Sequence, residues 1–135
     1  MAVKVVTARI DAKAKTVTLE GETGLQHKRT FAVKAGDTLT WNLEGVPQGS
    51  TVRVRFVAFP KTPATALLKK GKMVEGNAAL VDGGLVAAEA ADGAYSYEVD
   101  LLAPQGTTTL QCFWTDGAAT LPVGMGGGDK SSGPQ

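Results

Sequence analysis

The chain has 135 residues, of which 43% are hydrophobic and 20% charged, and its formal net charge is +1. This length predicts one domain with a single core, and the small net charge provides no overall field that would attract nucleic acid or a membrane surface. The lone cysteine, Cys112, excludes an intramolecular disulfide.

Residues 1–6 lack the charged and apolar regions of a secretory signal peptide. No apolar run reaches the roughly 18 residues that cross a bilayer. We therefore expect a cytoplasmic protein without membrane contact, with a virion as the alternative location.

Apolar and polar residues alternate along most of the chain, which predicts strands with one buried face. In chain order, the predicted strands cover residues 3–10, 16–20, 29–33, 38–43, 51–56, 95–101 and 110–114. About seven to eight strands separated by turn residues indicate an all-β fold, an antiparallel Greek-key β-sandwich. The expected core anchors are Trp41, Phe56, Tyr97, Val99 and Trp114.

Residues 63–70 depart from this alternation. They begin with a proline, which suits the first position of a helix, and they end with Lys69 and Lys70, which favour the negative end of a helix dipole. We expect one short helix here, packed over one end of the sandwich through Leu67 and Leu68.

The C-terminal residues 124–135 are rich in Gly and Ser, a composition typical of flexible linkers. The predicted organisation is a β-sandwich domain over residues 1–123, followed by this tail.

Charge is unevenly distributed along the chain. Residues 1–72 hold thirteen of the fourteen Lys and Arg but only five acids, for a net charge of +8, whereas residues 73–135 carry a net charge of −7. One interpretation is that strands from both halves interleave, so that the charges mix on the surface. The other is a molecule with a basic and an acidic face, suited to head-to-tail contact between copies.

Two stretches resemble the cupredoxins, the blue copper proteins. Residues 31–42, FAVKAGDTLTWN, are similar to the strand pair with the pattern V-K-x-G-D-T-V-T-W-x-N. Residues 93–99, GAYSYEV, are similar to the strand Gly-x-Tyr-x-Tyr-x-Cys, whose cysteine carries the copper thiolate in that family. The resemblance implies a cupredoxin-like sandwich, and an immunoglobulin-like one is the alternative.

The ligands that the resemblance would require for copper are missing. Val99 stands at the thiolate position, and no histidine follows Asn42 or Val99 within a few residues. A blue copper site takes two imidazoles, and the chain holds a single histidine, His27. We therefore expect no cofactor.

A weak alternative is a soft metal site made of Cys112, His27 and Met125, whose side chains suit Cu(I). However, Cys112 lies on the predicted inward face between Leu110 and Trp114, where cysteine is usually a buried hydrophobe. His27 is followed by two cationic residues that disfavour a bound cation.

No sequence pattern indicates catalysis, since no serine lies in a nucleophile-elbow context. Nucleic acid is an unlikely partner, because no aromatic platform accompanies the arginines of residues 51–56. Our expectation is a non-catalytic structural or adaptor protein that contacts other protein chains, as a homo-oligomer or a subunit of a shell, filament or virion surface.

The alternatives are a metal-binding or electron-transfer protein with an atypical site and a sugar- or peptide-binding module. The candidate interaction residues are Arg53, Arg55, Lys69, Lys70, Glu98, Asp100 and Met125.

Overall fold

The computed structural model describes residues 2–21, 26–27, 30–77, 79–114 and 123–125, and of residues 26–27, 30–32 and 123–125 it describes the backbone alone. These residues form eleven strands and no helix. The strands are β1 (Val3–Asp11), β2 (Thr16–Gly21), β3 (Gln26–His27), β4 (Thr30–Val33), β5 (Thr38–Glu44), β6 (Thr51–Ala58), β7 (Met73–Gly76), β8 (Leu80–Leu85), β9 (Gly93–Ala103), β10 (Gly106–Trp114) and β11 (Val123–Met125).

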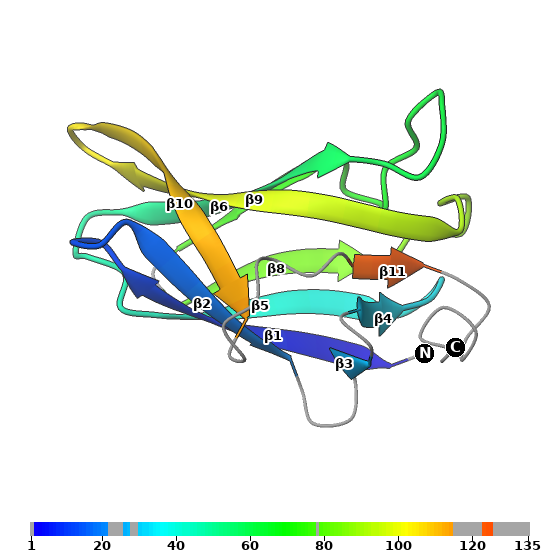
Figure 1. Ribbon diagram of the computed structural model, residues 1–135, viewed down its shortest axis with the longest axis horizontal. Coiled ribbons are helices and arrows are strands. Elements are labelled where there is room, and N and C mark those ends of the chain that lie inside the picture. The colour runs from blue at the N-terminus through cyan, green and yellow to red at the C-terminus, as the bar shows by residue number, and fades with distance from the viewer. Residues whose placement is uncertain (1, 22–25, 28–29, 78, 115–122, 126–135) are drawn as a thin grey trace.

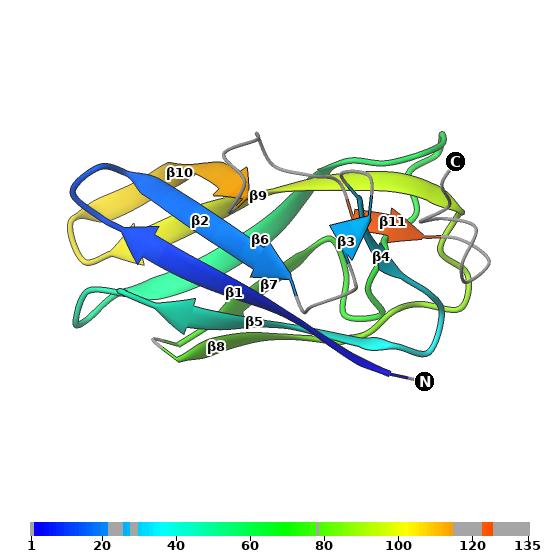
Figure 2. The same cartoon turned by 60° about the horizontal axis from the view of Figure 1, so that its bottom comes forward.

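The strands form two facing layers joined by β10 (Figure 1). In one layer β8, β5, β1 and β2 lie side by side (Figure 2), and in the other β7, β6 and β9 are neighbours. β10 pairs with β9 as far as Leu110 and with β2 from Gln111 onward, so it passes from one layer to the other. The result is a sandwich-like, nearly closed barrel, which agrees with the predicted all-β class.

The sheet is mixed, and the expected purely antiparallel Greek key of seven to eight strands is not found. β1 and β5, β2 and β10, and β4 and β11 each pair in parallel. Alternation of apolar and polar residues reveals which face of a strand is buried, but it carries no information about the direction of the neighbouring strand. The direction is decided by long connections such as the one from β1 to β5.

The prediction of a helix over residues 63–70 is wrong. The Leu67 carbonyl accepts a hydrogen bond from Ala87 N at 2.8 Å, and Lys69 N donates to the Leu85 carbonyl at 2.8 Å. This segment buries the adjacent side chains of Leu67 and Leu68 almost completely. Eight residues are too few for a stable isolated helix, and pairing with the end of β8 satisfies the backbone while burying both leucines.

The core anchors predicted from the alternation are confirmed, because all five are at most 5% exposed. Three of them form an aromatic cluster between the layers. The ring centroids of Trp41 and Tyr97 lie 5.5 Å apart, as do those of Phe56 and Tyr97, both in edge-to-face geometry. Such contacts add to the stabilisation that burial of aromatic area provides.

β11 (Val123–Met125) pairs with β9 and β4, so the sheet includes two residues of the segment expected as a tail. The remaining tail residues, 126–135, lie outside the described part of the chain.

Candidate functional site

Charged side chains from both halves of the chain meet on the outer face of β7, β6, β9 and β10. The register between these strands places two arginines against three acids and a threonine. We call this group the charged ladder: Glu75, Arg53, Asp100 and Thr109 form one row across the four strands, and Arg55 and Glu98 form the next.

Asp100 is the centre of the charged ladder, and its side chain is 0% exposed. Its Oδ2 accepts hydrogen bonds from Arg53 Nε at 2.8 Å and from Arg55 Nε at 3.1 Å. Its Oδ1 accepts from Thr109 Oγ1 at 2.8 Å and from Arg55 Nη2 at 3.2 Å. Burial by itself raises the pKa of Asp100, but the hydrogen bonds from Arg55, Thr109 and Arg53 outweigh it and hold this pKa below its ordinary value.

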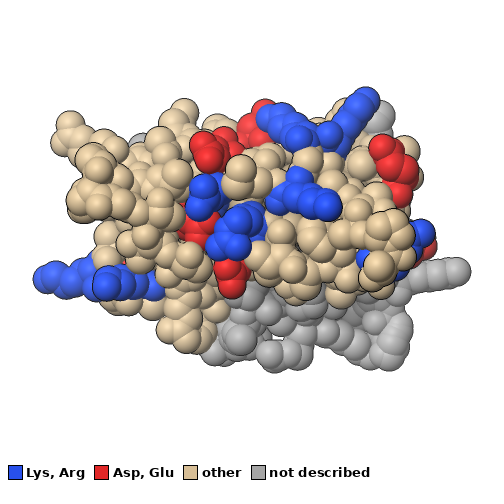
Figure 3. All heavy atoms as spheres, turned by 90° about the horizontal axis from the view of Figure 1, so that it is seen from above, with Lys and Arg blue, Asp and Glu red and all other residues tan. Residues whose placement is uncertain are grey.

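The outer members of the charged ladder are more exposed. Arg55 Nη2 donates to Glu98 Oε1 at 2.8 Å, and Arg53 Nη1 lies 4.0 Å from Glu75 Oε2. Hydrogen bonds from Arg55 to Asp100 and Glu98 raise the pKa of this guanidinium. Charges of both signs are interspersed over the middle of this face (Figure 3). The two predicted interaction arginines are therefore neutralised within the molecule, and they do not form a basic strip for phosphate groups.

The second group of interest lies on the connection between β6 and β7. We call the four exposed lysines Lys61, Lys69, Lys70 and Lys72 the lysine turn. Lys70 Nζ donates to the Asp82 carbonyl at 2.9 Å and lies 3.6 Å from Asp82 Oδ2. Lys72 Nζ lies 5.2 Å from the ring centroid of Phe59, a cation–π contact. Of the four, only Lys70 forms an ion pair with a carboxylate in the described part of the chain.

A third group lies on the connection between β8 and β9. We call the exposed residues Glu89 and Asp92 the acidic bend. Within the described residues neither forms an ion pair. Sequence reasoning missed the acidic bend and two members of the lysine turn, although one signal was available: residues 57–73 contain four lysines and no acid.

A second buried carboxylate, that of Asp37, has a structural role. Its Oδ1 accepts a hydrogen bond from Ala2 N and its Oδ2 accepts one from Lys34 N, both at 3.0 Å. These bonds close the turn before β5 and fix the start of β1 beside it, so both oxygens of this fully buried side chain are engaged.

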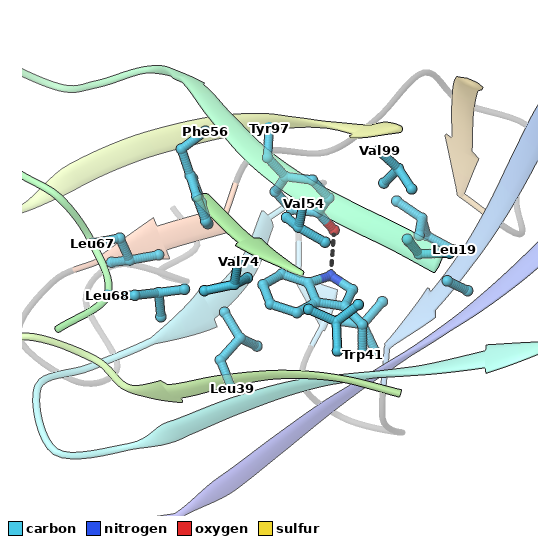
Figure 4. Close-up of a cluster of buried hydrophobic side chains, with 14 of the residues drawn as sticks. Leu19, Leu39, Trp41, Val54, Phe56, Leu67, Leu68, Val74, Tyr97 and Val99 are labelled. Atoms are coloured by element: carbon cyan, nitrogen blue, oxygen red, sulfur yellow. Dashed lines mark hydrogen bonds between the residues drawn. The ribbon is translucent and has the colours of Figure 1, made fainter. Parts of the chain in front are cut away.

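The position that the cupredoxin resemblance assigns to the copper thiolate lies in the hydrophobic core. Val99 is 1% exposed and belongs to the same cluster as Tyr97 and Trp41 (Figure 4). Trp41 Nε1 donates to the Tyr97 hydroxyl at 3.2 Å. Burial raises the pKa of Tyr97, and the hydrogen bond from Trp41 only partly offsets this effect. The surroundings of Val99 are thus hydrocarbon and aromatic groups.

The three residues of the weak metal alternative lie on separate strands. Cys112 is on β10, His27 on β3 and Met125 on β11. Cys112 is partly buried against the core, and its Sγ donates a long, 3.8 Å contact to the Leu110 carbonyl. The side chains of His27 and Met125 lie outside the described part of the structure, so this constellation, and Met125 as an interaction residue, stay predictions.

Within the described residues, no three His, Cys, Asp or Glu side chains are grouped so that they could hold a metal ion. The same residues include no helix long and apolar enough to cross a membrane. No protein family, curated protein or solved structure matches this chain.

Proposed function

We propose that this protein is a non-catalytic structural or adaptor protein that acts through contacts with other protein chains, as a subunit of a larger or repeating assembly. The proposal rests on exposed charged side chains that form no ion pair within the described residues. The charged ladder uses its arginines and acids internally, whereas most of the lysine turn and the whole acidic bend form no ion pair within the described residues.

One edge of the sheet is protected from the addition of a further strand, which favours contact through side chains instead. At one end of this edge of β8, Lys70 Nζ donates a hydrogen bond to the Asp82 carbonyl. At the other end, residues 67–69 cover the edge. Natural proteins use charged side chains and covering segments to stop edge strands from pairing with other chains. This edge of β8 is therefore blocked, and the unpaired surface charges are the contact-forming feature in this proposal.

Sedimentation velocity tests this proposal with the unmodified protein. We expect species larger than the monomer at concentrations up to hundreds of micromolar in about 20 mM NaCl, and a shift toward monomer in about 500 mM NaCl, because salt screens contacts between exposed charges. A protein that is monomeric under all these conditions would contradict the self-assembling form of the proposal.

A further inference from the structure

We propose that two copies of this chain contact each other through the lysine turn and the acidic bend, with the lysine turn of each copy facing the acidic bend of the other. This inference rests on the proposed function and deepens it, because it names the partner and the surface.

Within one copy, some charges of this surface have no partner of opposite charge among the described residues. Residues 73–129 contain no Lys or Arg, so the described acids of this region depend on cations from earlier in the chain. Arg53 and Arg55 pair with acids of β9, and Lys70 pairs with Asp82. Among the described residues, the acidic bend receives no such partner, Lys61 and Lys69 form no ion pair, and Lys72 contacts only the Phe59 ring.

The acidic bend lies beside one part of the lysine turn. Gly93, the first residue of β9, touches the β6–β7 connection, where an added Cβ would lie only 2.4 Å from Pro60 Cβ. Ala87 N also donates to the Leu67 carbonyl at 2.8 Å. The first contact places Asp92 of the acidic bend next to Lys61, whereas Lys69 lies beside Leu85, further along the β6–β7 connection. Both connections lie at the end of the molecule opposite the β1–β2 hairpin (Figure 1).

The backbone of the acidic bend is held in place by hydrogen bonds. Ala90 N donates to the Ala87 carbonyl at 3.3 Å, and the Tyr95 hydroxyl donates to the Ala91 carbonyl at 2.6 Å. The Tyr95 ring lies in the core and is 0% exposed. A surface that is already ordered loses little conformational entropy when it binds.

The arrangement of charges on this surface fits a two-fold symmetric contact between two copies. A surface that carries a basic group beside an acidic group is complementary to itself when a second copy is related by a two-fold axis. Each lysine turn then meets an acidic bend, and like charges are kept apart, which sets the orientation of the contact. A nucleic acid or an anionic membrane would meet Glu89 and Asp92 next to the lysines and be repelled by them, so the observations favour a second copy.

Charge reversal in pairs tests the contact. The variants are Lys61→Glu with Lys69→Glu, and Glu89→Lys with Asp92→Lys; Lys72 is left unchanged because it contacts Phe59. The matched control is Lys13→Glu with Lys15→Glu, two exposed lysines on the opposite end. Sedimentation velocity in about 20 mM NaCl measures the dimer dissociation constant, and thermal unfolding verifies that each variant is folded.

We expect each reversed variant to weaken self-association at least about tenfold, and the control to change it less than about threefold. An equimolar mixture of the two reversed variants should regain association close to that of the unmodified protein, because opposite charges face each other again.

Four results would overturn the inference. If the unmodified protein associates and the reversed variants associate equally well, this surface is the wrong one while the proposed function stands. If the mixture fails to regain association, or if the control loses as much as the reversed variants, the contact is not specific to these two groups. If the unmodified protein is monomeric, the inference fails together with the self-assembling form of the proposed function.

Discussion

Asp100 shows how one residue can join three strands. It is a fully buried carboxylate on β9 that accepts hydrogen bonds from two arginines of β6 and from Thr109 of β10. A buried charge is tolerated only when it is paired and its lone pairs are satisfied. The charged ladder meets both conditions, which explains why an acid occupies the outward face of a strand and yet is hidden from solvent.

Asp100→Asn is expected to lower the free energy of unfolding by about 2–3 kcal/mol, because it removes the counter-charge of two partly buried arginines. Urea denaturation measures this loss. Glu98→Gln is the matched control, since Glu98 also bonds Arg55 but its side chain is 47% exposed, and its loss should stay below about 1 kcal/mol. Equal losses of unfolding free energy in the two variants would show that the burial of Asp100 does not increase its contribution to stability.

The lowered pKa of Asp100 predicts how stability depends on pH. Its pKa in the folded protein lies below the ordinary value of 3.8. The stabilisation is therefore fully present above pH 3.8 and is lost as the pH falls through the folded-state pKa. Denaturation of the protein and of Asp100→Asn between neutral pH and about pH 2 should show a difference in unfolding free energy that shrinks below this value. A difference independent of pH would contradict the assignment.

At the scale of elements, the start of β9 closely approaches the β6–β7 connection. Gly93 has φ of +136° and an added Cβ would lie 2.4 Å from Pro60 Cβ. Glycine is the residue that tolerates both the backbone conformation and the contact. The same approach places Asp92 of the acidic bend beside Lys61 of the lysine turn, so this glycine connects the packing of the fold to the proposed surface.

Gly93→Ala is expected to destabilise the protein by about 1–3 kcal/mol more than Gly71→Ala. Gly71 has a similar φ of +131° but nothing within 4 Å of the added Cβ, so it reports the backbone strain alone. Thermal or urea unfolding of both variants measures the difference. If both substitutions lower the free energy of unfolding equally, the contact with Pro60 does not contribute to the effect of Gly93→Ala.

At the scale of the whole molecule, β10 makes the two layers one folding unit. It pairs with β9 in one layer and with β2 in the other, and the buried residues of both layers form one cluster. Neither layer can open along β10 without breaking pairs to the other.

We therefore expect a single cooperative unfolding transition. Trp41→Phe and Trp114→Phe leave one tryptophan each, on β10 and β5 respectively. In each variant, tryptophan fluorescence and far-UV circular dichroism should give the same urea midpoint. Separate midpoints within one variant would mean that the layers unfold independently.

The candidate site was only partly predictable. Arg53, Arg55, Glu98 and Asp100 are recognisable from the sequence as outward residues of two strands, but their pairing depends on the register between β6 and β9. A one-residue shift would move every side chain to the other face. The burial of Asp100 further depends on β10 bringing Thr109 alongside, which no local pattern reveals.

The sequence by itself determined the all-β class, the inward faces of the main strands and the aromatic anchors, because side-chain alternation is a local property of a strand. Only the tertiary structure decided the parallel pairs, the non-helical course of residues 63–70 and the meeting of the acidic and basic halves. These depend on contacts between segments far apart in the chain, where burial and hydrogen bonding with a distant strand outweigh local preference.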